Sequence, residues 1–497
     1  MAMDSILIWN EVALRANLVS HTDGSKEQNG PTLSSRALAI AHLAMYDAYA
    51  GVIKNPAVLP AYLSGLPPAP AGSTTEAAVA AAAHKTLSSL FPSQKISFDN
   101  DLAIHGDPGN PGHGFGETVG QAILDDRMND PGAGASGYIP KKSRGKHRPD
   151  PDNPGQGFHG PFYGAKSKGF AITNRHVLKA PPLDNGDYQK ALRQVRVKGI
   201  QPELMGTLPA TMSDDKRTPE ETLIGIYWAY DGTPNLGTPP RLYNQIIKKL
   251  AIAKDNPEAD NARLFAFVNA AMGDAGILCW DQKYIYEFWR PVLGIREHDM
   301  SFGPEATQAN NEISKDADPF WLPLGSPSSN ALNKGIGQGQ SSYPFAQVMP
   351  AIVKNFTPPF PAYPSGHATF GAAAFHITRL FYGVKSGDRK SDKLLKDLDF
   401  TSDELNGMNQ DNKGTVRPNH RRDFNDGLWQ MILENGLSRI FLGVHWSFDA
   451  FAVKGDGKPD LSKMDVGGVP LGLTIAEDIF MSGGGKAPKK STVAPRP

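Results

Sequence analysis

The stretch LAIAHLAMYDAYAGV, residues 38–52, is almost continuously apolar. A run of this length predicts a buried helix, because strands in a protein core are shorter. Helical patterns recur at 75–91, 219–230, 261–286, 366–382 and 426–441. Two of these stretches carry start signals: Thr74 and Thr75 can cap the first, and Pro219 with two glutamates opens the second. Alternating strand patterns are hard to find, so the sequence predicts an all-α protein.

Glycine and proline are abundant, with 51 and 41 residues, and they cluster in long irregular stretches. Residues 106–169 and 301–363 are too long to be plain connections, so we expect them to wrap the helices or to wall a pocket. The end of the chain, 482–497, predicts a disordered tail because it has little to bury. We therefore expect an N-terminal helical region at 1–200, a C-terminal helical region at 201–481 and this tail.

The overall composition excludes some classes of protein. The chain has 497 residues, 40% of them hydrophobic, and its 51 basic residues balance 51 acidic ones. This balance argues against general binding to nucleic acid or to anionic membranes. No signal peptide and no membrane-length apolar run are visible, so we expect a soluble protein, either cytoplasmic or secreted by an unrecognised route. The single cysteine, Cys279, follows apolar residues and is expected to be buried rather than catalytic.

The first segment that carries chemistry is KYIYEFWRP, residues 283–291. Lys283 and Arg290 are seven residues apart, which predicts that both lie on one face of a helix that Pro291 ends. Two like charges on one face are unfavourable unless an anion lies between them. A solvated basic face is the usual alternative, but Trp280 and Trp289 surround the pair with bulk that favours a pocket wall.

The second segment is YPSGHATF, residues 363–370. Pro364 and Ser365 are typical of a helix N-terminus, where free backbone N–H groups attract an anion. Gly366 would let an anion approach the backbone closely, and His367 could exchange a proton with it. An ordinary helix cap beside a structural histidine explains this segment, taken alone, about as well.

The third segment is SRIFLGVHWSFD, residues 438–449. Arg439 and His445 would lie on different faces of a straight helix, but Gly443 between them could let the chain turn. Asp449 could accept the Nδ1 proton of His445 and leave Nε2 free as a ligand. The alternative is an arginine at a helix end beside a surface ion pair.

Together the three segments supply one lysine, two arginines, a serine, a backbone N–H and two histidines. This set suits a tetrahedral oxyanion, either phosphate or vanadate. It does not suit zinc or iron, which need more histidine, cysteine or carboxylate ligands. The sequence also contains no P-loop and no Rossmann glycine fingerprint.

The complete pattern, K-x6-R-P, then P-S-G-H, then S-R-x5-H-x3-D, resembles that of the vanadium haloperoxidases and the type-two phosphatidate phosphatases. Longer runs resemble the fungal-type vanadium chloroperoxidase branch. These runs are TPPFPAYPSGHATFG at 357–371, IFLGVHW at 440–446, YWAYDG at 227–232, GTPPRLYNQ at 237–245 and GGVPLG at 467–472. The resemblance spans nearly the whole chain and is weakest at 106–169.

This resemblance implies an all-α fold of two four-helix bundles with long irregular loops, and a site in the second bundle. It implies that His445 bonds vanadium through Nε2 and that His367 acts as acid and base on the opposite side. The groups that would hold the vanadate oxygens are Lys283, Arg290, Arg439, Ser365 and the Gly366 N–H.

The resemblance also implies roles for surrounding residues. Asp231 would pair with one of the arginines, and Lys283 would polarise hydrogen peroxide. Trp280 and Phe360 would line the halide pocket. An aromatic residue at 360, where a histidine could stand, resembles the chloroperoxidase branch.

The implied activity is oxidation of chloride or bromide by hydrogen peroxide, with vanadate as cofactor and small organic molecules as acceptors. An acid phosphatase with His445 as nucleophile is the main alternative, because the same cluster would bind phosphate. A phosphate- or vanadate-binding protein without catalysis ranks last, since His367 would then have little purpose. The oligomeric state cannot be read from the sequence.

Overall fold

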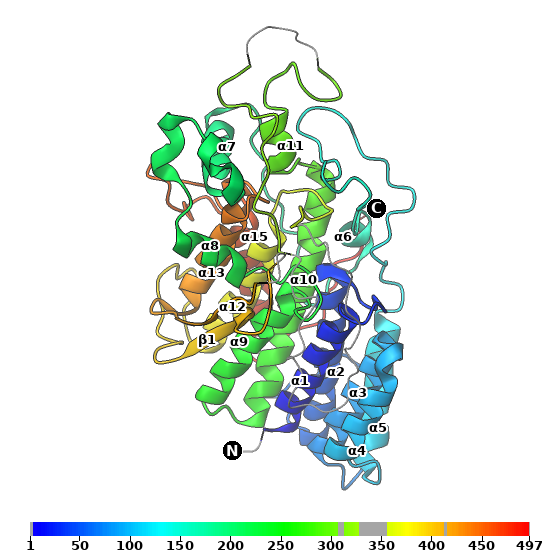
Figure 1. Cartoon of the computed structure of the whole chain (residues 1–497). Coiled ribbons are helices and arrows are strands. Elements are labelled where there is room, and N and C mark those ends of the chain that lie inside the picture. The colour runs from blue at the N-terminus through cyan, green and yellow to red at the C-terminus, as the bar shows by residue number, and fades with distance from the viewer. Residues whose placement is uncertain (1–2, 307–312, 328–354, 412–414, 497) are drawn as a thin grey trace.

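The computed structural model describes residues 3–306, 313–327, 355–411 and 415–496, which form a mostly helical protein (Figure 1). The N-terminal helices are α1 (Ser5–Ser20), α2 (Gly30–Ile53), α3 (Thr75–Leu90), α4 (Lys95–His105) and α5 (Pro111–Asp126). The middle of the chain forms α6 (Tyr163–Lys166), α7 (Gly186–Lys198), α8 (Pro219–Tyr227), α9 (Pro239–Ala253), α10 (Glu258–Tyr286) and α11 (Pro291–Arg296). The last helices are α12 (Gly366–Phe381), α13 (Gly427–Phe441), α14 (Ser447–Ala450) and α15 (Gly468–Ser482). Short 3₁₀ turns lie at Pro92–Gln94, Pro202–Thr207 and Ala210–Asp215.

Two bundles organise these helices. In the first, α1, α2, α3 and α5 pack on one another, and in the second, α12 packs against α10, α13 and α15. Helix α10 also packs along α2 and so joins the bundles, which share one continuous hydrophobic core. The predicted all-α class is therefore confirmed. The boundary expected between residues 200 and 201 stays a prediction.

The six stretches with helical patterns all form helices, five of them within three residues of their predicted bounds, whereas α2 begins at Gly30, eight residues before the predicted start. Thr74 caps α3 as predicted, since its side chain accepts a hydrogen bond from Ala77 N, whereas Thr75 is the first residue of the helix. Pro219 begins α8 as predicted, and Thr218, which the sequence analysis did not name, makes a capping box with Glu221. Helix α8 ends at Tyr227, three residues earlier than predicted. The described residues also include one antiparallel pair of strands, β1 (Asp399–Asn406) and β2 (Asn419–Asp423), which the sequence did not reveal.

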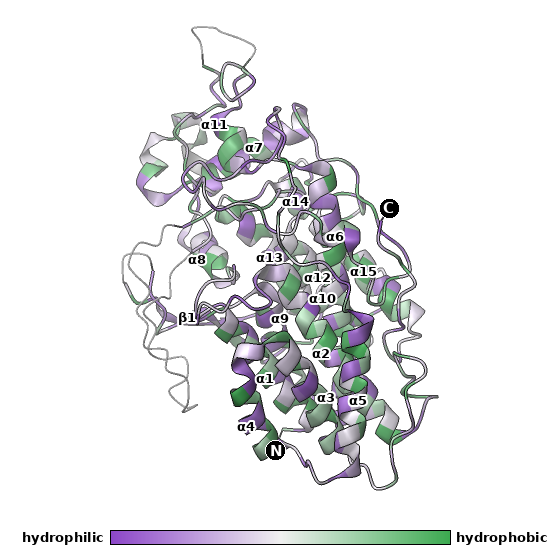
Figure 2. Cartoon of the chain, turned by 90° about the vertical axis from the view of Figure 1, so that its right-hand side faces the viewer, coloured by the Kyte–Doolittle hydropathy of each residue, from purple (hydrophilic) through white to green (hydrophobic). Residues whose placement is uncertain are grey.

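Helix α5 lies inside the stretch 106–169 that the glycine content marked as loop-rich. Asn110 caps the helix and Pro111 begins it. Its glycines allow close packing on α3, because a Cβ atom at Gly116 would lie 2.1 Å from the carbonyl oxygen of Ala78. These glycines therefore allow α5 to pack closely on α3, and they do not break the helix. Figure 2 shows hydrophilic and hydrophobic residues mixed along the outer helices α4 and α5, as amphipathic helices require.

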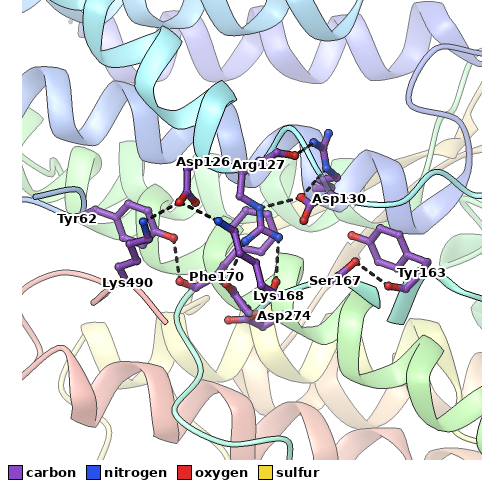
Figure 3. Close-up of polar contacts among 12 residues, drawn as sticks. Tyr62, Asp126, Arg127, Asp130, Tyr163, Ser167, Lys168, Phe170, Asp274 and Lys490 are labelled. Atoms are coloured by element: carbon purple, nitrogen blue, oxygen red, sulfur yellow. Dashed lines mark hydrogen bonds and ion pairs between the residues drawn. The ribbon is translucent and has the colours of Figure 1, made fainter. Parts of the chain in front are cut away.

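The C-terminal segment 483–496 differs from the predicted disordered tail. Lys490 pairs with Asp126 at 2.6 Å, and Arg496 pairs with Asp281 at 3.0 Å. The backbone also bonds to the 163–175 region, with Ser491 N donating to Phe170 O at 2.8 Å. Figure 3 shows Lys490 within a polar network that joins α5, the segment around Phe170 and α10. Polar contacts with the rest of the chain hold this segment. Ala487, which is buried in the core, and Val493, which packs against it, add apolar contacts.

Helix α10 is long and apolar enough to span a membrane, but 94% of its most apolar window is buried inside the protein. It is therefore a core helix of the globular fold, and it carries the first segment of the candidate site.

Candidate active site

The predicted helix start at the PSGH turn is present. Ser365 is the N-cap of α12, and its backbone N donates to Asp449 O at 2.8 Å. His367 lies in the first turn of the helix. Gly366 faces the Trp280 ring so closely that a Cβ atom would lie 3.3 Å from it. The N-terminus of α12 therefore points into the site, as its sequence predicts.

The geometry predicted for Lys283 and Arg290 was wrong in one respect. Helix α10 ends at Tyr286, and Glu287 adopts the left-handed conformation with φ 51°. Arg290 lies in extended backbone, and Pro291 begins α11 instead of ending α10. The two cations therefore do not share one helix face. The break nevertheless turns Arg290 back toward the site, where its Nη1 lies 2.8 Å from His445 Nε2.

The segment around His445 agrees with the prediction. Helix α13 ends at Phe441, and Gly443 adopts φ 74°, which lets the chain turn back. The His445 Nδ1 atom lies 2.8 Å from Asp449 Oδ2, which also accepts from Trp446 N at 3.0 Å. Asp449 thus orients the ring and leaves Nε2 directed toward the site.

Asp231, just after α8, forms the ion pair that the resemblance implied. Two nitrogens of Arg439 reach its two oxygens at 3.0 and 2.9 Å. The Nε2 atom of His367 lies 3.8 Å from Asp231 Oδ1, too far for a hydrogen bond. Asp231 therefore fixes the arginine and faces the histidine.

The site carries an excess of buried positive charge. The side chains of Lys283, Arg290 and Arg439 are each 0% exposed. In the part of the chain that the structure describes, two carboxylates lie in the same site, those of Asp231 and Asp449. Burial lowers the pKa of Lys283 to about 7 and that of Arg290 to about 9. An anion bound among these groups would offset that cost.

The histidines experience the same charge. Burial first, and the neighbouring arginines and lysine second, lower the pKa of His367 and of His445 well below its usual value. Burial also raises the pKa of Asp449 to about 7. Both imidazoles are therefore neutral near neutral pH, which leaves nitrogen lone pairs available for a ligand or a proton.

Three nitrogen atoms at the site, two of them arginine donors, are buried and have no hydrogen-bond partner in the part of the chain that the structure describes. They are Arg290 Nη2, Arg439 Nε and His367 Nε2. Within the same residues, no group of three or more His, Cys, Asp or Glu side chains could hold a metal cation. Converging unsatisfied donors with excess positive charge suit an oxyanion and not a cation.

Lys283 differs from this pattern. Its ammonium donates to the carbonyl oxygens of Pro361 at 2.8 Å and Ala362 at 3.0 Å, and also to that of Pro364. All three protons are therefore in use, and the lysine stabilises the 361–364 turn that leads into α12. Cys279 is buried beside this turn, as expected.

A cavity of about 210 Å³ opens over the unsatisfied donors. Seven of the predicted site residues line it: Asp231, Trp280, Phe360, Gly366, His367, Arg439 and His445. The others, Lys283, Arg290, Ser365 and Asp449, are fully buried behind the wall. The ring centres of Trp280 and Phe360 lie 4.8 Å apart, and the two rings form an apolar wall beside the cations.

The sequence matches the vanadium chloroperoxidase N-terminal domain over residues 2–169 and the second helical-bundle domain of the same enzymes over 263–458. It is also 34% identical to a vanadium chloroperoxidase of Curvularia inaequalis, over 96% of this chain and 90% of that protein. The chain belongs to the vanadium chloroperoxidase family.

Two solved structures share the fold of this chain. A bacterial vanadium-dependent iodoperoxidase aligns with a TM-score of 0.63 at 18% identity, over 96% of this chain and 97% of that one. A bacterial vanadium-dependent chloroperoxidase in its holo form aligns with a TM-score of 0.56 at 15% identity, over 90% and 91% of the two chains. At such identities the likeness concerns the fold alone.

The sequence analysis did not identify some of the residues that line the cavity of this protein. His159 and Pro31 come from the N-terminal half, and Phe356 from the irregular stretch before the PSGH turn. These residues carry no motif. The available signal was the length of the irregular stretches 106–169 and 301–363, which predicted pocket walls without indicating which side chains face inward.

Proposed function

We propose that this protein is a vanadate-dependent haloperoxidase that oxidises chloride and bromide with hydrogen peroxide to hypohalous acid. The observation that carries the proposal is the pair of buried, unsatisfied donors on Arg290 and Arg439, beside the unpartnered Nε2 atom of His367. Such donors are unfavourable unless an oxyanion accepts their hydrogen bonds. Family membership favours vanadate over phosphate as that oxyanion.

The residues divide the binding of vanadate among them. His445, oriented by Asp449, offers Nε2 as the ligand to the metal once Arg290 Nη1 releases it. The free nitrogens of Arg290 and Arg439 and the Gly366 N–H are available to the oxygens. When bound, vanadate supplies a Lewis acid that activates hydrogen peroxide toward attack by a halide.

His367 is the acid–base group in this proposal. Its Nε2 is unpartnered and faces the cavity, so it can take a proton from hydrogen peroxide. An anion among the cations would raise the low pKa of the imidazole toward neutrality. Asp231 faces the same nitrogen at 3.8 Å and would favour the protonated form.

For Lys283 we propose a role different from the one that the resemblance implied. Its protons are bound to backbone carbonyls, so it acts on the cavity through its charge and by holding the 361–364 turn. The ammonium lies 5.5 Å from the centre of the Trp280 ring and 5.2 Å from that of Phe360. These rings would form the halide pocket and exclude water from it.

Vanadate binding to the chelator-treated protein, measured by equilibrium dialysis, tests the cofactor assignment. We expect one vanadate per chain, displaced by phosphate, because both ions are tetrahedral and anionic. His445→Ala should weaken binding by at least about tenfold, since outer partners of metal ligands alone are worth that much. His84→Ala, at a half-exposed ion pair on α3, is the matched control and should bind as the parent does. Wild-type affinity in His445→Ala would show that the ligand lies elsewhere.

A further inference from the structure

His159 lies in the wall of the same cavity as His367, Arg439 and His445, and the proposed reaction gives it no task. Its Nε2 atom lies 2.9 Å from the hydroxyl of Thr32 in the first turn of α2. Its ring centre lies 6.1 Å from that of Trp280 and 6.2 Å from that of Phe360. An imidazole from the N-terminal half of the chain is thus placed beside the apolar wall of the site.

Hydrogen bonds to two other segments of the chain fix the position of His159. Its backbone N donates to Pro359 O at 2.9 Å, and its carbonyl accepts from Trp280 Nε1 at 3.2 Å and from Tyr284 at 2.7 Å. Gly30 leaves room for the ring, because a Cβ atom there would lie 2.4 Å from it. The ring is therefore fixed by contacts with α2, α10 and the 357–360 stretch.

One ring nitrogen of His159 remains available. Nε2 is engaged with the Thr32 hydroxyl, which leaves Nδ1 without a hydrogen bond to the described residues. Burial, together with the charge of His21, lowers the pKa of His159 to about 4, so the ring is neutral at neutral pH. A neutral imidazole nitrogen can accept a hydrogen bond from a hydroxyl group or, in the other tautomer, donate one.

The cavity is larger than its inorganic reactants need. Its volume is about 210 Å³, whereas a water molecule occupies on the order of 30 Å³. Aromatic rings make up part of the wall, with Phe356, Phe360 and Phe370 among the lining residues. A cavity with an aromatic wall and a few polar groups, here including His159, is typical of a site for a small organic molecule.

We propose that this chamber binds a phenol as the organic acceptor, with the phenolic hydroxyl hydrogen-bonded to His159 and the ring against Phe360 and Trp280. This inference rests on the proposed function, which supplies hypohalous acid within the same cavity. A ring carbon forms a bond to the halogen as the O–X bond breaks. The oxygen leaves as hydroxide and combines with the proton that the ring carbon loses, so a halophenol and water result.

Binding to the vanadate-free protein tests this inference without any need for turnover. The probes are 4-fluorophenol and 4-fluoroanisole, observed by ¹⁹F NMR, because the anisole has the same ring and lacks the hydroxyl proton. We expect the parent to bind the phenol about fivefold or more tighter than the anisole, as one neutral hydrogen bond allows. His159→Phe should reduce this ratio to about one.

Two variants make the result specific. His159→Gln keeps a hydrogen-bonding group and should retain part of the preference, and His84→Gln on α3 should retain all of it. A change in packing alone would affect both probes and leave their ratio unchanged. An equal affinity for both probes in the parent, an unchanged ratio in His159→Phe, or binding of neither probe would overturn the inference. Failure of the proposed function would show separately, as absence of vanadate-dependent halide oxidation in the parent.

Discussion

At the scale of single residues, the site depends on which donors are left unsatisfied. Arg439 gives two nitrogens to Asp231 and retains Nε, while Arg290 gives two to carbonyl oxygens and His445 and retains Nη2. The residue types and their spacing were predictable from sequence. The hydrogen bonds of Lys283 could not be predicted from the sequence. Its three carbonyl partners belong to a turn whose path no local sequence pattern specifies.

Phe360 offers a residue-level test of halide choice. Lys283 Nζ lies 5.2 Å and the Arg290 guanidinium carbon 5.0 Å from the centre of its ring, so this apolar face shields both cations from water. Chloride is harder to oxidise than bromide and needs the stronger electrophile that dry surroundings favour. Phe360→His should lower the ratio of chloride to bromide turnover by roughly fivefold or more.

The ratio should be measured at matched pH and full vanadate loading. Phe360→Leu is the matched control, because it removes the ring but keeps the pocket apolar, and it should change the ratio less. If Phe360→His and Phe360→Leu lower both turnover rates equally, the ring only packs the turn. The chloroperoxidase assignment would then lose its basis, as it would if the parent showed no chloride turnover.

At the scale of elements, apolar periodicity predicted where helices form but not how they meet. The spacing of Lys283 and Arg290 predicted one helix face, whereas Glu287 breaks α10 between them. The 138–147 loop supports this break: Tyr138 donates to Glu287 at 3.0 Å, and His147 N donates to Glu287 O at 2.7 Å. Because contacts from a segment distant in sequence stabilise the end of α10, the local sequence alone could not predict where this helix ends.

The glycines of α5 give an element-level test of helix packing. Gly116→Ala should destabilise the protein by about 1–3 kcal/mol, because its Cβ would lie 2.1 Å from the backbone oxygen of Ala78. Gly114→Ala, on the same helix with nothing within 4 Å, should stabilise it by about 0.5–1 kcal/mol. Urea unfolding measures both. Equal effects of the two substitutions would mean that α3 and α5 do not pack as described.

At the scale of the whole molecule, the active-site cavity draws on both halves of the chain. Pro31 and His159 come from the N-terminal half, while Arg439 and His445 come from near the end. The three motifs predicted the basic side of the cavity, and the resemblance predicted its aromatic wall. The remaining wall was not predictable, because proline and glycine stretches show where loops occur and not which side chains they turn inward.

The C-terminal segment 483–496 offers a test at this scale. Its ion pairs and backbone bonds fasten it across the 163–175 region, which lies next to the loop that carries His159. Removing residues 483–497 should lower Tm by roughly 2–4 °C, as the loss of about 2–4 kcal/mol would in a chain of this length. It should also speed proteolysis within 163–175. Lys489→Ala, at an exposed residue of the same segment, is the control. An unchanged Tm and cleavage rate would mean that the segment is as mobile as its composition predicts.

Bromide oxidation by the chelator-treated protein, followed during titration with vanadate at constant hydrogen peroxide, tests the central claim most directly. Hydrolysis of a phosphate ester is measured in the same samples. We predict that hypobromous acid production rises with vanadate, saturates at one vanadate per chain and is suppressed by excess phosphate. Bromide oxidation that is indifferent to vanadate would contradict the account. So would hydrolysis of the phosphate ester with no halide oxidation at any vanadate concentration.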